Sequence, residues 1–305
     1  MSVRKLLAYA AIYILWGGSF LAIREIVVAT PPFFAAGFRF LLAGLLLILY
    51  SYMRGGVELN LRKLGSVTAL GFLMFTCLYA MLFWAEVRLP SGIAAVVSAM
   101  IPIWIFVGEV VILRTQRATV VSVAGILLGF GGVAILALHS GNSQGTAEFL
   151  PTLATIAGTV CWSAGTLWSR KLSLPRPQTA NAGWQMAIGG FLLLVLSGVA
   201  GEYHRLPAAS ATWNATVILS MAYLIFAASV LTFTSYVWLI AHEPAGKVAS
   251  YAYVNPLIAL ILGVVFAGER LNASQLLGAA LVIAGVFATL TGKQTQPVHA
   301  KKVTV

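Results

Sequence analysis

Two ionisable residues fall inside apolar runs of this sequence, where a charge is a candidate for binding chemistry. Arg39 lies a few residues into one run, and Glu109 lies near the end of another. A charge inside a bilayer is costly, so such residues tend to serve substrates or ions. Arg39 could bind a carboxylate, or it could reach the outer interface or pair with Glu86. Glu109 could bind protons or cationic groups, although pairing with Arg114 or Arg117 at the interface is the simpler interpretation.

Aromatic residues are concentrated in the apolar runs. Each ring taken singly is more typical of packing or of an interfacial belt than of a ligand contact. Together they predict an aromatic-lined cavity, which would suit indole or phenyl groups through ring stacking. Our candidates for ligand contacts are Trp16, Tyr79, Trp84, Trp104, Trp162, Tyr251 and Tyr253.

Polar residues in the apolar runs could orient a ligand by hydrogen bonds, among them Ser98, Gln185, Thr232 and Asn255. Serine and threonine in membrane helices more often bond to their own backbone. Asn255 directly precedes a proline, so its amide could serve both a ligand and a freed carbonyl.

Two prolines interrupt long apolar segments at matching places. The first segment contains Pro90 and Pro102, and the second contains Pro244 and Pro256. Pro244 follows Pro90 by 154 positions, and Pro256 follows Pro102 by the same number. A proline inside a helix removes a backbone hydrogen bond and kinks the helix. Paired breaks of this kind in two halves of a membrane chain indicate a transport site. We therefore predict that Pro102 and Pro256 are hinges.

The composition excludes an ordinary soluble domain. Hydrophobic residues make up 60% of the 305, charged residues only 9%, and the mean hydropathy is +0.94. The net charge of +11 comes from short loops between apolar runs, which indicates membrane orientation and not nucleic-acid binding. Aspartate is absent and the four histidines fall in loops or the tail. We therefore expect no metal, no cofactor and no catalytic site, and an intramembrane lipid enzyme is only a remote alternative.

Ten stretches are long and apolar enough for membrane helices of about 20 residues. They span 6–23, 33–53, 65–86, 91–113, 118–138, 150–169, 181–201, 215–239, 246–267 and 273–291. A polar stretch at 140–148 divides them into a first repeat, residues 1–144, and a second repeat, residues 145–292. The basic tail, 293–305, is expected to be disordered.

The two halves resemble each other along their length. Trp16 and Trp162 match at an offset of 146, and Gly125 and Gly278 match at 153. Because each half has an odd number of helices, equivalent helices run in opposite directions. The predicted fold is an all-α integral membrane protein whose ten helices form two inverted five-helix repeats around a central cavity. The Gly125-x-x-x-Gly129 spacing favours helix packing inside a monomer over a dimer face.

The basic residues give an orientation. Fourteen Lys and Arg lie on the side of the N-terminus and four on the other side, with Arg39 inside a helix. The positive-inside rule then places both termini in the cytoplasm.

Several short motifs resemble one family. They are Trp16-Gly-Gly-Ser-Phe20, the run from Pro32 to Arg39, Asn255-Pro256 and Gly268-Glu269-Arg270. With them the chain resembles the drug/metabolite transporter superfamily, EamA-type branch, and is similar to bacterial amino-acid and metabolite exporters, including the aromatic amino acid exporter group. The resemblance implies ten helices around a central cavity. The small multidrug exporters of that superfamily depend on a carboxylate in the first helix, whereas helix 1 here has none before Glu25.

The function expected from the sequence is secondary transport. A multi-pass protein of the bacterial cytoplasmic (inner) membrane, working as a monomer among lipids, would export aromatic or other neutral amino acids by alternating access. No phosphate-binding loop is present, so ATP is not the direct energy source. The alternative is a broad-specificity, proton-coupled drug or metabolite exporter. The sequence leaves open whether transport is coupled to protons.

Overall fold

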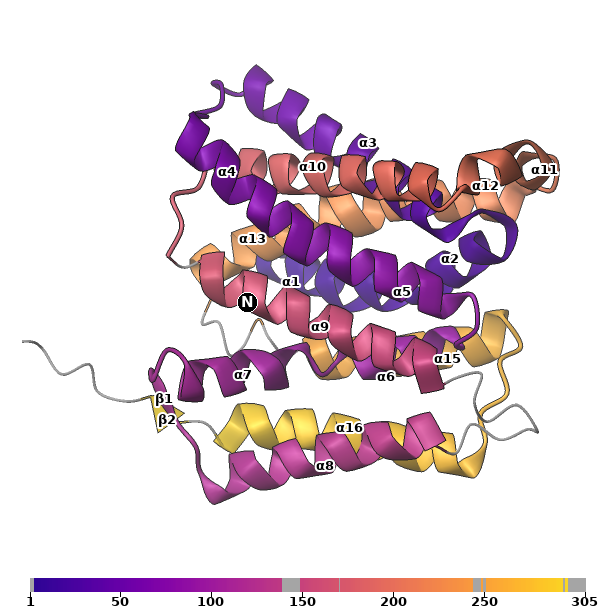
Figure 1. Ribbon diagram of the computed structural model, residues 1–305. Coiled ribbons are helices and arrows are strands. Elements are labelled where there is room, and N and C mark those ends of the chain that lie inside the picture. The colour runs from indigo at the N-terminus through magenta and orange to yellow at the C-terminus, as the bar shows by residue number, and fades with distance from the viewer. Residues whose placement is uncertain are drawn as a thin grey trace, which may run out of the picture.

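The computed structural model describes residues 3–138, 149–169, 171–243, 248, 251–292 and 294–295. The chain is almost entirely helical, with short connections (Figure 1). The first half contains α1 (Val3–Ala10), η1 (Ala11–Leu15), α2 (Trp16–Ala29), α3 (Pro32–Met53), α4 (Leu61–Leu70), η2 (Gly71–Cys77), α5 (Leu78–Glu86), α6 (Ser91–Ser98), α7 (Ile101–Val111), β1 (Gln116–Arg117) and α8 (Val120–Leu138). The second half contains α9 (Phe149–Ser169), α10 (Gln178–Val199), η3 (Glu202–Arg205), α11 (Leu206–Ser210), α12 (Ala215–Ala222), η4 (Tyr223–Leu231), α13 (Thr232–His242), α15 (Tyr251–Phe266), α16 (Ala273–Gly292) and β2 (Gln294–Thr295).

Every predicted membrane stretch overlaps a helical segment. Among the described residues, seven helices are long and apolar enough to cross a membrane, and two shorter apolar helices cover Val120–Leu136 and Tyr251–Phe266. The chain is therefore a multi-pass membrane protein. That all ten stretches cross the membrane stays a prediction, because α9 does not meet the same criterion of length and apolarity.

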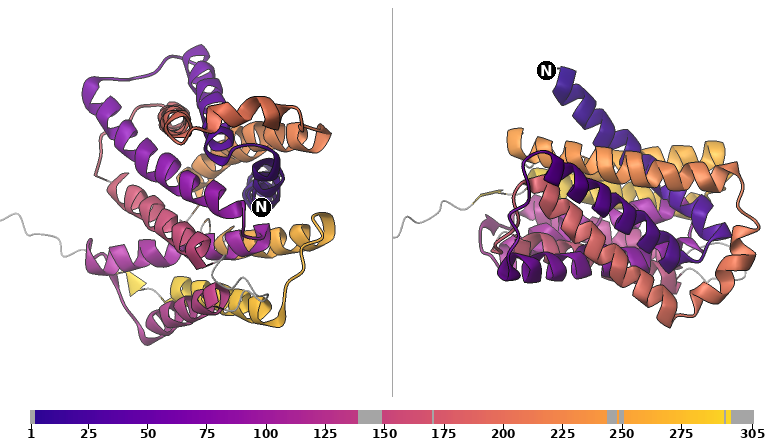
Figure 2. Two further views of the ribbon diagram at one scale, coloured as in Figure 1. Left: turned by 45° about the vertical axis from the view of Figure 1, so that its right-hand side comes forward. Right: turned by 90° about the horizontal axis from the view of Figure 1, so that it is seen from above.

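Two antiparallel helix pairs flank the molecule, α3 with α10 at one edge and α8 with α16 at the other (Figures 1 and 2). Glycines let their backbones touch. A Cβ on Gly44 would lie 2.6 Å from the carbonyl oxygen of Gly183, and one on Gly190 would lie 2.8 Å from that of Gly37. The same reciprocity links α8 and α16, where a Cβ on Gly132 would lie 2.6 Å from the carbonyl oxygen of Gly278. The predicted close packing of the Gly125 helix thus occurs within one chain.

Three helical turns between these edges are widened to the π form: η1, η2 and η4. In a π turn the backbone N–H bonds to the carbonyl five residues earlier, instead of four as in an α-helix, so nearby carbonyls lose their regular partners. Residues 71–77 of η2 and 225–231 of η4 are equivalent at the offset of 154 found in the sequence. The widened turns therefore occupy matching places in the two halves.

The two prolines predicted as hinges have different settings. Pro102 lies in the first turn of α7, directly after the break between α6 and α7 at Ala99 and Met100. Pro256 lies inside α15, which continues through it. Parts of the second proline segment, Pro244 and Gly246 among them, lie outside the described residues. So does the boundary predicted between residues 144 and 145.

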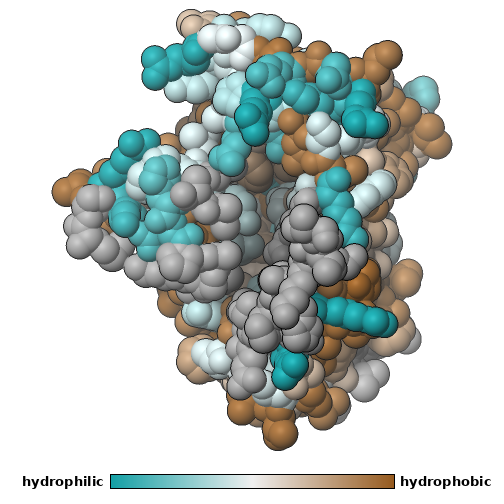
Figure 3. Space-filling model, turned by 90° about the vertical axis from the view of Figure 1, so that its left-hand side faces the viewer, coloured by the Kyte–Doolittle hydropathy of each residue, from teal (hydrophilic) through white to brown (hydrophobic). Residues whose placement is uncertain are grey.

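The molecule has two distinct ends. The N-terminal end carries the start of α1 and the connections 54–60, 112–119 and 171–177, and the far end carries the connections 30–31, 87–90, 200–214 and 267–272. Polar side chains gather at the N-terminal end, and its face is hollowed near the centre (Figure 3). At the far end the helices are closely packed, because Ile26, Phe83 and Leu89 expose at most 1% of their surface.

The tail contains one ordered contact that sequence reasoning did not expect. Gln294–Thr295 pair antiparallel with Gln116–Arg117 at the N-terminal end. The expectation of disorder is wrong for these two residues, since the strand that follows α7 offers them backbone partners. The residues from 296 onward lie outside the described part of the chain.

Candidate functional site

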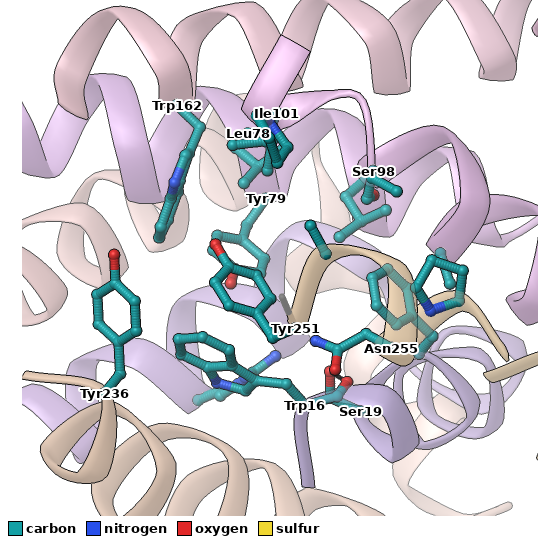
Figure 4. A pocket seen from close by; sticks show the side chains of 18 residues that line it. Trp16, Ser19, Leu78, Tyr79, Ser98, Ile101, Trp162, Tyr236, Tyr251 and Asn255 are labelled. Atoms are coloured by element: carbon teal, nitrogen blue, oxygen red, sulfur yellow. Dashed lines mark hydrogen bonds between the residues drawn. The ribbon is translucent and has the colours of Figure 1, made fainter. Parts of the chain in front are cut away.

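A cavity lies between the two halves of the chain (Figure 4). Its walls come from α2, α3, α5, α6, α7, α9, α13 and α15. Six aromatic residues line it: Trp16, Phe20, Tyr79, Trp162, Tyr236 and Tyr251, of which all but Phe20 are labelled in Figure 4. The cavity is thus apolar and aromatic, with a small number of polar groups.

The rings form two groups on different walls. Trp162 lies against Phe75 and Tyr79, with ring centroids 5.7 and 6.3 Å apart. Trp16 lies against Tyr236 and Tyr251, at 5.3 and 5.2 Å. The two tryptophans that match in the internal repeat therefore stand in different ring groups of the same cavity. Aromatic side chains bring large apolar area and prefer offset or edge contacts, so these walls suit a planar apolar group.

Arg39 is the charged group of the cavity lining. Its side chain is 2% exposed, and its Nε donates a hydrogen bond to Ser229 Oγ at 3.1 Å. The guanidinium lies over the rings of Phe40 and Tyr79, 4.5 and 5.5 Å from their centroids. Among the described residues, its Nη1 has no hydrogen-bond partner. A fixed guanidinium with an unused donor is suited to bind an anion such as a carboxylate.

Side chains from neighbouring helices bond to the carbonyls that the π turns release. Trp16 Nε1 donates to the carbonyl oxygen of Ala228 in η4 at 2.9 Å, and Tyr223 Oη donates to that of Leu15 in η1 at 2.7 Å. These reciprocal bonds hold the first helix of one half against the η4 helix of the other. They also fix the plane of the Trp16 ring at the cavity wall.

Asn255 is anchored in the same way. With its amide nitrogen directed at the carbonyls, Nδ2 lies 3.1 Å from the oxygen of Ile12 and 3.0 Å from that of Tyr13. This orientation is assigned from the hydrogen-bond network. The amide nitrogen thus serves carbonyls of η1, and Asn255 also lines the cavity.

The structure brings together only part of the predicted set. The cavity is lined by the following predicted residues: Trp16, Arg39, Tyr79, Ser98, Pro102, Trp162, Tyr251, Asn255 and Pro256. It is not lined by Trp84, Trp104, Glu109, Gln185, Thr232 and Tyr253.

Most of the predicted residues outside the lining make other contacts. Trp104 Nε1 donates to Thr159 Oγ1 at 3.0 Å, and Gln185 Nε2 donates to Asn181 Oδ1 at 2.8 Å. Thr232 Oγ1 donates to the carbonyl of Ala227 within η4 at 2.7 Å.

Two aromatic rings among them face other partners. Trp84 lies under the guanidinium of Arg88, and Tyr253 packs edge-on against Phe287. Glu109 is 8% exposed and lies in α7, away from the cavity lining.

Sequence reasoning missed several lining residues. Ser19 and Phe20 lie one turn beyond Trp16, so the helical period alone would have placed them on its face. Tyr236 lines the cavity as well, but its spacing in the sequence does not separate it from the surrounding aromatic residues. Among the described residues, no group of three His, Cys, Asp or Glu side chains could hold a metal ion.

The chain matches one family model along both halves. The model described as "EamA-like transporter family" matches residues 4–138 and 150–291. The chain is 32% identical over 306 residues to the "uncharacterized inner membrane transporter YedA" of Escherichia coli K12, covering 97% of this chain and 95% of that protein. It is 28% identical over 291 residues to a "probable amino-acid metabolite efflux pump" of the same strain, covering 92% and 93%.

A solved crystal structure has a similar fold. It aligns with a TM-score of 0.62 at 21% identity and covers 95% of this chain and 99% of that one. At this identity the likeness concerns the fold alone.

Proposed function

Because the chain belongs to the EamA-like transporter family, of the drug/metabolite transporter superfamily, we propose that it exports aromatic and other neutral amino acids as a secondary transporter. The observation that carries the proposal is the buried guanidinium of Arg39 in a cavity with aromatic walls. The carboxylate of an amino acid would bind Nη1 of Arg39, and its side chain would lie between the two ring groups. The Oδ1 atom of Asn255 would accept a hydrogen bond from the ammonium group.

The same cavity disfavours the alternative of a broad exporter of cationic drugs. A cation near Arg39 would meet a like charge in a medium of low dielectric constant, where repulsion is strong. Among the cavity-lining residues no Asp or Glu would offset that charge. An amino-acid cargo also agrees with the printed name of the Escherichia coli efflux pump that the chain resembles.

Alternating access between two inverted five-helix repeats is the proposed mechanism. The reciprocal glycine contacts of α3 with α10 and of α8 with α16 support the repeat, and so do the two stretches matched by the family model. In this proposal residues 1–144 and 145–292 rock against each other about the α6–α7 break and Pro256. The chain would work as a monomer in the bacterial inner membrane, with both termini in the cytoplasm.

Ligand binding to the purified full-length protein tests this proposal. Tryptophan should raise the unfolding temperature, whereas tryptamine, which lacks the carboxylate, should raise it much less, because it has no anion for Arg39. A cationic dye that stabilises the protein while tryptophan does not would contradict the amino-acid assignment.

A further inference from the structure

A second polar cluster lies at the far end of the molecule, outside the cavity lining. Its centre is Glu86, the last residue of α5, which is 0% exposed. Among the described residues, neither carboxyl oxygen of Glu86 has a hydrogen-bond partner. Burying a carboxylate without a donor is costly, so this position calls for an explanation.

A second carboxyl group of the far end, that of Glu269, has the opposite setting. Glu269 accepts hydrogen bonds from the backbone N–H groups of Ser91 and Gly92, at 2.7 and 3.3 Å, at the first turn of α6. A helix N-terminus stabilises a negative charge through its free N–H groups and its dipole. Glu269 therefore has two backbone donors, whereas the Glu86 carboxyl group has none among the described residues.

The cations near Glu86 do not compensate it by hydrogen bonding. Arg24 of α2 donates from Nη1 to the backbone carbonyl of Glu86, but it makes no hydrogen bond to the Glu86 carboxyl group. Arg39 of α3 is bonded to Ser229. The other elements packed against α5 are η2, α6 and α9, and they contain no Asp, Glu, Lys, Arg or His, although Cys77 and Cys161 lie in η2 and α9. An ionised Glu86 would attract the guanidinium of Arg24, so the observed contact fits a neutral carboxyl group.

The cluster closes the cavity at its far end. Glu86 lies one helical turn beyond Leu82 on α5, and Arg24 lies one turn beyond Phe20 on α2. Ser91 lies one turn before Ala95 on α6. Leu82, Phe20 and Ala95 all line the cavity. The Ser91 hydroxyl belongs to the cluster and is also without a partner in the described chain. Any opening of the far end must therefore separate these groups and admit water to Glu86.

We propose that Glu86 is a proton-binding site whose occupancy is linked to closure of the far end. In the closed conformation the carboxyl group is neutral and packed without donors. When the far end opens, water hydrates the group, the O–H bond breaks and the proton passes to the water on that side. Because the closed state binds the extra proton, closure is favoured at low pH and is lost as the pH on the far side rises.

A sodium ion is a poorer occupant of the same cluster. Sodium needs several oxygen ligands, whereas the Glu269 oxygens already accept two N–H bonds and the backbone carbonyl of Glu86 already accepts one from Arg24. A proton neutralises Glu86 without requiring several oxygen ligands. Sodium is therefore one of the alternatives that the experiment must separate.

Infrared spectroscopy of the full-length protein in lipid nanodiscs tests the site without any substrate. The wild type at pH 7 should show the C=O absorption of a protonated carboxyl group, which Glu86→Gln should lack. Glu202→Gln is the matched control, because Glu202 caps α3 at Phe33 and Phe34 as Glu269 caps α6. The control should keep the absorption. An unchanged absorption in Glu86→Gln would overturn the proposal.

The unmutated protein gives a second readout in case a variant fails to fold. Raising the pH should remove the absorption, and adding sodium chloride in place of potassium chloride should leave it unchanged. A wild type with no such absorption at pH 7, or one whose absorption is lost on adding sodium, would contradict a proton site.

The transport readout rests on the proposed function, whereas the infrared readout does not. Tryptophan exchange through the wild type should depend on the pH at the far side, with the open-to-closed ratio changing up to about tenfold per pH unit. Glu86→Gln should exchange tryptophan with no such dependence. Absent tryptophan exchange with the carboxyl absorption present would reject only the amino-acid assignment. Equal pH dependence in both proteins would reject the proton site.

Discussion

At the scale of single residues, the cavity is built from a charged anchor and two groups of rings. Arg39 is held by Ser229 and by the rings of Phe40 and Tyr79, so little side-chain entropy is lost when an anion binds its free Nη1. This preorganisation supports the proposal that Arg39 binds a ligand, a question that the sequence had left open between substrate, interface and pairing with Glu86.

Replacing Arg39 should weaken amino-acid binding selectively. A hydrogen bond to a charged group contributes about 1.5–3 kcal/mol, so Arg39→Gln should raise the KM for tryptophan by roughly tenfold or more. Tryptamine binding should change little, because it has no carboxylate. Arg88→Gln is the control, since Arg88 lies over Trp84 outside the cavity lining. An equal loss for both ligands would show that Arg39 serves only packing.

Substitution can distinguish Trp162 from Trp84, two tryptophans that the sequence predicts as ligand contacts. Trp162 lines the cavity and Trp84 does not. Trp162→Leu should lose aromatic contact worth about 0.5–1.5 kcal/mol and raise the KM for tryptophan roughly two- to tenfold. Trp84→Leu should leave the KM unchanged, and the opposite order would contradict the cavity assignment.

At the scale of helices, the π turns explain why part of the site was not foreseen. Ser229 of η4 accepts a hydrogen bond from Arg39, and carbonyls of η4 and η1 accept hydrogen bonds from Trp16 and Asn255. The Thr232 hydroxyl donates to a backbone carbonyl of η4. No sequence pattern indicated the π turns, because each lies inside an ordinary apolar run. Trp16 and Tyr79 could be predicted as cavity residues from their aromatic side chains, but these local shifts of the backbone could not be predicted.

Removing the Asn255 amide should destabilise the packing of α15 on η1. Asn255→Ala would remove the side-chain donor that serves the carbonyls of Ile12 and Tyr13, at a cost of about 1–3 kcal/mol. The melting temperature should fall clearly below that of Gln185→Ala, a variant that removes an amide bonded to the Asn181 side chain. Equal melting temperatures for the two variants would refute the anchoring role.

Close backbone contact between α8 and α16 can be tested with two glycines of one helix. A Cβ on Gly125 would lie 2.6 Å from the backbone nitrogen of Thr289, whereas within the described chain a Cβ on Gly131 would meet no atom within 4 Å. Gly125→Ala should therefore lower the melting temperature. Gly131→Ala should preserve or raise it, because alanine stabilises a helix by about 0.5–1 kcal/mol relative to glycine. Similar losses in both variants would contradict the packing.

At the scale of the whole molecule, composition and internal repetition were enough to predict a multi-pass helical protein. Charge scarcity and apolar runs identified the helices, and the offsets of 146 and 153 anticipated which glycine-rich helices resemble each other. The sequence did not predict that these equivalent helices pack against each other, or that the tail pairs with residues 116–117. Such long-range contacts depend on how the two halves come together, which local patterns do not encode.

The far end and the cavity form one system in this account. In the proposed mechanism the substrate binds near Arg39, and the Glu86 cluster, one helical turn beyond the cavity lining, closes the path to the far side. Separating the halves would open this seal and hydrate the cavity from the far side. Transport by rocking of the repeats therefore requires the substrate site and the seal to move together.

The most direct test of the central claim is flux of labelled tryptophan in proteoliposomes containing the purified protein. Threonine and a cationic dye are added as competitors, with Arg39→Gln and empty liposomes as controls. We predict saturable tryptophan flux that unlabelled tryptophan suppresses, that the dye leaves unchanged and that Arg39→Gln reduces. Tryptophan flux no greater than in empty liposomes, with transport of the dye instead, would contradict an exporter of amino acids.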